Sequence, residues 1–79
     1  MKISSKYVLR NILGQNIVEP GDIILNESGA FLWNQLREEK SKDDLIYALL
    51  AEYDISEETA TEAVDIFIFK ISSIPDIFE

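Results

Sequence analysis

The chain has 79 residues, a formal net charge of −8 and a hydrophobic content of 47%, with neither cysteine nor histidine. This length predicts one domain, residues 1–79, near the lower limit for a self-sufficient core. The missing residue types exclude disulfides, thiolate metal sites and the commonest general base. We therefore expect no cofactor, no metal site and no catalytic residue.

Membrane and export signals are also absent from the sequence. No apolar run reaches the length of a bilayer span, and residues 1–6 lack the apolar core of a signal peptide. We expect a cytoplasmic protein with no membrane partner.

The charge is distributed unevenly along the chain. Residues 1–26 hold three basic and two acidic side chains, whereas residues 27–79 hold four basic and thirteen acidic ones. The second part would repel a polyanion. Nucleic acid is therefore not an expected partner.

The first third of the chain predicts three β-strands, at about residues 6–13, 16–19 and 22–26. Turn-forming residues separate them, at Gly14–Asn16 and again at Pro20 and Gly21. Three strands with such tight connections predict an antiparallel meander.

The rest of the chain predicts three helices, at about residues 27–38, 42–53 and 57–72. Asn26, Ser41 and Ser56 are suitable N-caps, and Asp44 would complete a capping box with Ser41. Apolar residues then recur at helical spacing. We expect Trp33, Leu36, Leu49, Phe67 and Ile71 to share one core.

The third helix has more apolar surface than one core face needs. Ile66 and Phe69 lie away from the stripe that contains Phe67. Two interpretations stay open. Either Ile74, Ile77 and Phe78 fold back over the surplus, or it forms a groove or an interface, for example in a homodimer.

The stretch Leu25-Asn26-Glu27-Ser28-Gly29-Ala30-Phe31-Leu32-Trp33 is the most specific part of the sequence. Further residues belong to the same pattern: Tyr7–Arg10, Ile23 and Ile24, Leu45, Leu49–Leu50, Glu52–Asp54, Ala63, Val64, Phe67 and Ile71. In these residues the whole chain resembles the PqqD family, whose name comes from coenzyme PQQ (pyrroloquinoline quinone) biosynthesis.

The resemblance implies an α+β, winged-helix-like domain: a three-stranded antiparallel sheet followed by a three-helix bundle. It also implies a non-catalytic recognition element, which binds the leader of a ribosomally made precursor peptide and presents it to a modifying enzyme, often a radical-SAM enzyme. The leader would add as a strand and contact the third helix. Carried onto this chain, the implied peptide-binding residues are Asp22, Ile23, Ile24, Leu25, Asn26, Val64, Phe67, Ile68 and Ile71.

The sequence departs from the family pattern in two ways. The segment before the third strand is short, being only Glu19–Asp22, so an abbreviated sheet is expected. The positions of Ile24 and Phe69 are usually polar in the family. Both changes add apolar surface, which would serve a dimer as well as a peptide.

Three other functions compete with peptide recognition. A winged-helix DNA-binding protein would share the helical core, but Lys70 is the only basic residue of the third helix. An enzyme would have to use carboxylate pairs such as Glu58 and Glu62, which are typical of solvated helix starts. A dimeric interaction module remains open as well.

Overall fold

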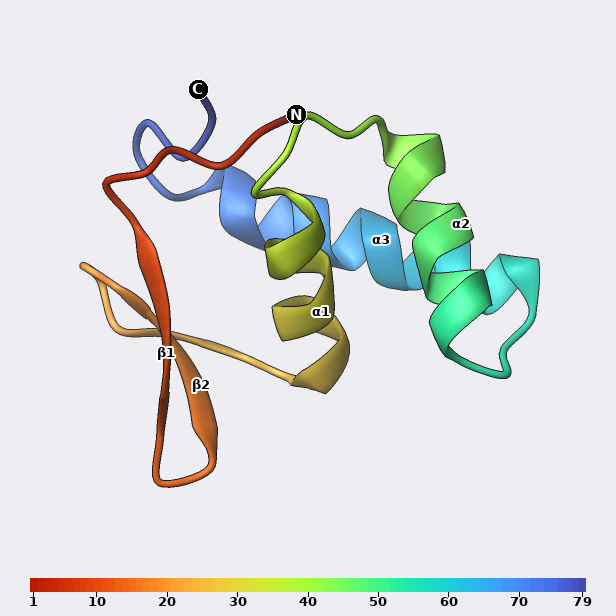
Figure 1. Cartoon of the computed structure of the whole chain (residues 1–79), viewed down its shortest axis with the longest axis horizontal. Helices are drawn as coiled ribbons and strands as arrows, with labels where there is room; N and C mark the ends of the chain where they lie inside the picture. The colour runs from red at the N-terminus through yellow and green to blue at the C-terminus, as the bar shows by residue number, and fades with distance from the viewer.

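The computed structural model describes all residues, Met1–Glu79, and confirms the expected α+β architecture. A three-stranded antiparallel sheet comes first and three helices follow (Figure 1). The elements are β1 Val8–Ile12, β2 Gln15–Glu19, β3 Ile23–Leu25, α1 Glu27–Gln35, α2 Lys42–Glu52 and α3 Glu57–Ser72.

The first hairpin turns one residue earlier than its sequence predicts. Ile12 pairs with Gln15, which leaves Leu13 and Gly14 as a two-residue loop. Both have positive φ, 53° and 83°, as a type I′ turn requires. As a result β2 begins at Gln15 rather than at residue 16, and β1 is shorter than the predicted 6–13.

The sheet has the order β1-β2-β3, so β3 lies at an edge. Three residues, Pro20–Asp22, connect β2 to β3, and Gly21 and Asp22 have positive φ. The sheet is abbreviated as expected, because β3 contains only three residues. Asp22 and Asn26, predicted to belong to this strand, flank it instead.

The three helices begin where their caps predict. The side chain of Asn26 accepts a hydrogen bond from the Gly29 amide, and Ser41 and Asp44 form a complete capping box. α1, however, ends at Gln35 rather than at residue 38. Main-chain bonds to the N-terminal segment explain this difference, since the amide of Ile3 donates to Leu36 O and the amide of Lys40 donates to Met1 O.

The core lies between the sheet and the three helices, with α1 central and α3 crossing behind it (Figure 1). Trp33, Leu36, Leu49, Phe67 and Ile71 belong to one buried cluster, which confirms the predicted core. β2 and β3 contribute Val18 and Leu25.

The residues after α3 fold back onto the core, as the first of the two interpretations expected, but they do not cover the apolar surplus. Ile74 and Ile77 are buried, and Phe78 forms a β-bridge with Ile3. The two residues that define the surplus stay uncovered, since Ile66 is 60% exposed and Phe69 84%. None of the helices combines the length and the apolar character that a membrane crossing requires.

Candidate functional site

A groove lies between the junction of β3 with α1 and the neighbouring face of α3. One wall comes from the junction and the other from α3; the lining residues are Leu25, Asn26, Ser28, Gly29, Ala63, Ile66, Phe67 and Lys70. The groove encloses about 220 Å³, less than the roughly 300–1,000 Å³ of a typical small-molecule site. Its size and its largely apolar walls suit a few side chains of an extended peptide.

The junction wall depends on local bonds at the start of α1. Asn26 Oδ1 accepts from the Gly29 amide at 2.7 Å and from Ser28 Oγ at 3.1 Å. A Cβ atom on Gly29 would lie 3.0 Å from Asn26 Oδ1 and 3.4 Å from Leu25 Cβ. The absence of a Cβ at Gly29 therefore lets the first turn of α1 approach Leu25 closely.

Beside the groove runs the edge strand β3. In an antiparallel strand the N–H and C=O of one residue point to the same side, and successive residues alternate. The groups of β3 that point away from β2 therefore have no strand partner. The carbonyl oxygen of Ile24 accepts a hydrogen bond from Lys70 Nζ of α3 at 2.6 Å, so this carbonyl is accessible from the α3 side.

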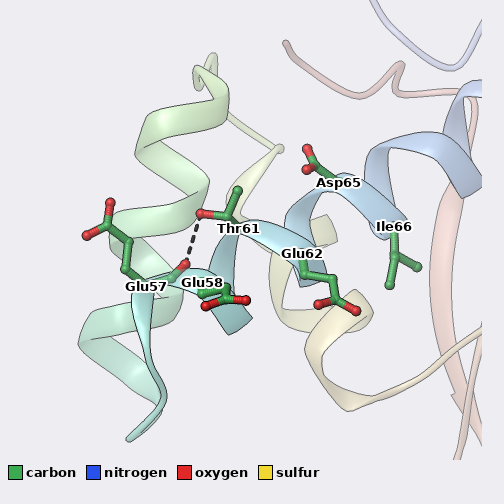
Figure 2. Close-up of a pocket in the computed structure, with 6 residues that line it drawn as sticks. All are labelled: Glu57, Glu58, Thr61, Glu62, Asp65 and Ile66. Atoms are coloured by element: carbon green, nitrogen blue, oxygen red, sulfur yellow. Dashed lines mark hydrogen bonds between the residues drawn. The ribbon is translucent and has the colours of Figure 1, made fainter.

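The N-terminal half of α3 is acidic, in contrast to the end that contains Lys70. Figure 2 shows an open hollow on this half of the helix, lined by Glu57, Glu58, Thr61, Glu62, Asp65 and Ile66. Asp65 Oδ1 pairs with Lys42 Nζ of α2 at 2.6 Å. The carboxylates do not form a group of three that could hold a metal ion. Ile66 lines both this open hollow and the groove, so the groove leads into acidic surface.

The structure brings together only part of the predicted peptide site. Leu25, Asn26 and Phe67 line the groove, Ile23 and Ile24 belong to the adjacent strand, and Asp22 precedes it. That these residues bind peptide stays a prediction.

Three residues predicted on α3 do not line the groove. Val64 and Ile71 are fully buried, and Ile68 is partly buried against the core. The wall is formed by Ala63, Ile66 and Lys70 beside Phe67 instead. At 100° per residue these residues lie on one flank of Phe67, while Ile68 lies on the other. Helical periodicity defined both flanks, but nothing local indicated which one would face β3.

Two ionisable side chains have shifted pKa values, and both lie outside the groove. The Ser41 amide and hydroxyl, which bond to Asp44, lower the pKa of that carboxyl. Burial raises the pKa of Tyr53, and the carboxylates of Glu27 and Glu52 raise it further. Tyr53 makes an edge contact with Phe31 of α1, with ring centroids 5.8 Å apart. Both shifts follow from the packing and capping of α1 and α2.

A comparison with protein families assigns the chain. The family model for coenzyme PQQ synthesis protein D (PqqD) matches residues 7–72. The chain belongs to the PqqD family. Its PqqD-family fold is shared with the solved structure of TbiB1 in complex with the TbiA(beta) leader peptide. That match has a TM-score of 0.74 and 22% identity, and it covers 98% of this chain and 94% of that one. No curated protein matches the chain.

Proposed function

We propose that this PqqD-family chain binds the leader of a ribosomally made precursor peptide and presents it to a modifying enzyme, such as a radical-SAM enzyme. The observation that carries the proposal is the free edge of β3 beside the groove that Phe67 and Ala63 line. The fold of TbiB1, which was solved with a leader peptide bound, supports it.

Strand addition explains how such a site works. The peptide backbone pairs with the free N–H and C=O groups of β3, which provides affinity without regard to sequence. Side chains alternate along an extended peptide, so every second one points to the same face. Those that face α3 enter the groove, and the apolar groups of Leu25, Ile66 and Phe67 select among them. Recognition of this kind requires no catalytic group, and we propose a non-catalytic role.

The acidic surface of the protein suits the presentation of the bound peptide to a modifying enzyme. The net charge of −8 and the carboxylates of Glu58 and Glu62 favour a basic surface on the modifying enzyme. Complementary charge accelerates association, most strongly at low salt. The same carboxylates disfavour binding of α3 to DNA phosphates.

The test first searches the neighbourhood of this gene for a short peptide gene. The synthetic leader of that peptide is then titrated into the labelled protein and followed by amide chemical shifts. We expect the largest shifts in residues 23–29 and 63–70. Ile24→Pro removes an edge N–H and should reduce binding strongly. Ile66→Asp places a charge in the groove and should reduce it as well.

Phe69→Asp is the matched control for the groove variant. It adds the same charge to the same helix at a residue outside the groove, so binding should be retained. Shifts confined to α2, or binding unchanged by both Ile24→Pro and Ile66→Asp in folded protein, would show that the leader binds elsewhere.

A further inference from the structure

Lys70 differs from most basic residues of the chain in what it contacts. Lys2, Lys6, Arg10 and Lys42 each pair with a carboxylate. The Lys70 ammonium makes no ion pair, although the chain has fifteen acidic residues. It donates instead to the neutral main-chain carbonyl of Ile24 at 2.6 Å.

The Ile24 carbonyl is also an acceptor that strand addition would use. It belongs to the middle residue of the three-residue edge strand β3, so a peptide N–H and the Lys70 ammonium compete for it. A peptide that pairs with Ile24 leaves Lys70 without its acceptor at the wall of an apolar groove. Lys70 is exposed in the free protein, so water satisfies its ammonium there. A peptide that covers the groove excludes this water, and the ammonium then weakens binding unless the peptide supplies another acceptor.

No other group of the groove accepts a hydrogen bond from the Lys70 ammonium. Asn26 Oδ1 already accepts from Gly29 and Ser28, and the other lining groups are mainly apolar. Lys70 is the only basic residue in the lining. A carboxylate is its strongest partner, because a hydrogen bond between two charged groups is shorter and stronger than one between neutral groups.

We propose that Lys70 determines specificity by selecting a peptide with an aspartate or glutamate beside Ile24. This inference rests on the proposed function. In the free protein the ammonium caps the edge carbonyl, and on binding it turns to the peptide carboxylate. The bound peptide then combines an acidic residue at this point with apolar residues that enter the groove next to Phe67.

A displayed library of random fifteen-residue peptides, selected on the full chain, provides the probe. We expect the enriched peptides to share an apolar pattern with an acidic residue at one fixed position. The same selection on Lys70→Glu should replace that residue with lysine or arginine. Amide shifts in residues 23–26 on adding one enriched peptide would place it at the β3 edge.

The coupling between the two charges is measured with one enriched peptide and its amide counterpart, Asp to Asn or Glu to Gln, by fluorescence anisotropy. Lys70→Met and the amide substitution should each weaken binding about tenfold or more. Combined, they should weaken it little further, because both remove the same ion pair. Lys40→Met changes the net charge equally and should leave the affinity unchanged, because the Lys40 ammonium makes no ion pair and lies outside the groove.

Two results would overturn the inference in distinguishable ways. Peptides that bind at β3 without an acidic preference, and bind Lys70→Met equally well or more tightly, would make Lys70 a simple cap on the edge. In that case the proposed function stands and the specificity role fails. If the wild-type chain enriches no peptide, or only peptides that leave residues 23–26 unshifted, the proposed function and the inference fail together.

Discussion

Leu13 is the residue whose local conformation conflicts most with its chemistry. It is 99% exposed at the tip of the first hairpin and has a φ of 53°. In the left-handed region a Cβ atom crowds the following carbonyl, at a cost of roughly 1–2 kcal/mol. Asparagine and glycine are preferred at this position of a type I′ turn. The hairpin therefore forms here despite Leu13, because the pairing of β1 with β2 determines where the chain turns.

Replacing Leu13 with asparagine should therefore stabilise the protein. We expect a gain of about 1 kcal/mol in the free energy of unfolding, measured by urea denaturation. Leu13→Ala also removes the exposed side chain, but alanine lacks the amide whose local hydrogen bonds stabilise asparagine in the left-handed region, so it should change stability little. Equal stability of the asparagine and alanine variants would contradict this account.

Among the elements, α2 shows how a helix start is held by local bonds. Ser41 Oγ accepts from the Asp44 amide at 3.1 Å, and Asp44 Oδ2 accepts from the Ser41 amide at 2.9 Å. The second bond is stronger to the ionised carboxylate than to the protonated acid, and it is the main reason why the pKa of Asp44 is lowered. The pKa of Asp44 is lower in the folded state than its ordinary value of 3.8, so the ionised carboxylate stabilises the fold at pH values above 3.8. This stabilisation is lost as the pH falls through the folded-state pKa.

Ser41→Ala should lower the free energy of unfolding by about 1 kcal/mol at neutral pH. It should also raise the pKa of Asp44 toward its ordinary value, although the bond from the residue 41 amide remains. Thermal unfolding and an NMR titration of the Asp44 carboxyl measure the two effects. Ser5→Ala serves as the control, since Ser5 is exposed and caps no helix. A stable variant with an unchanged Asp44 pKa would show that the capping box contributes nothing.

At the scale of the whole molecule, the apolar surface is larger than the peptide groove alone accounts for. Phe69 is 84% exposed and does not line the groove, and Ile24 is 52% exposed. Ile24 pairs with Ile17, whose neighbour Val18 is fully buried. Since side chains alternate along a strand, Ile24 points to the outer face of the sheet. We propose that such surface is covered in a homodimer.

The dimer is tested by sedimentation at micromolar concentration. We expect the wild-type chain to sediment as more than a monomer and Phe69→Glu to shift it toward monomer, because a carboxylate is costly to bury. Tyr47→Glu adds the same charge at another exposed aromatic residue, on α2, and should have no effect. Monomers alone for both wild type and Phe69→Glu would remove this proposal.

The sequence by itself determined the features that depend on short separations along the chain. Asn26, Ser41 and Ser56 cap their helices through bonds that span three residues, so their positions predicted all three helix starts. Turn-forming residues between apolar segments predicted the three strands, and helical periodicity predicted the core around Trp33. The Leu25–Trp33 stretch predicted the family. The β3 edge was predicted as well, although its outermost residues, Asp22 and Asn26, lie outside the strand.

Only the tertiary structure decided which flank of α3 faces that edge. Ala63, Ile66 and Lys70 lie on one side of Phe67 and Ile68 on the other, and the helix pattern alone treats the two sides alike. The same holds for the end of α1, which depends on main-chain bonds to Met1 and Ile3. The bond between Lys70 and Ile24 joins residues 46 positions apart. Local physics cannot specify such a contact, because it forms only when the whole chain has packed around its core.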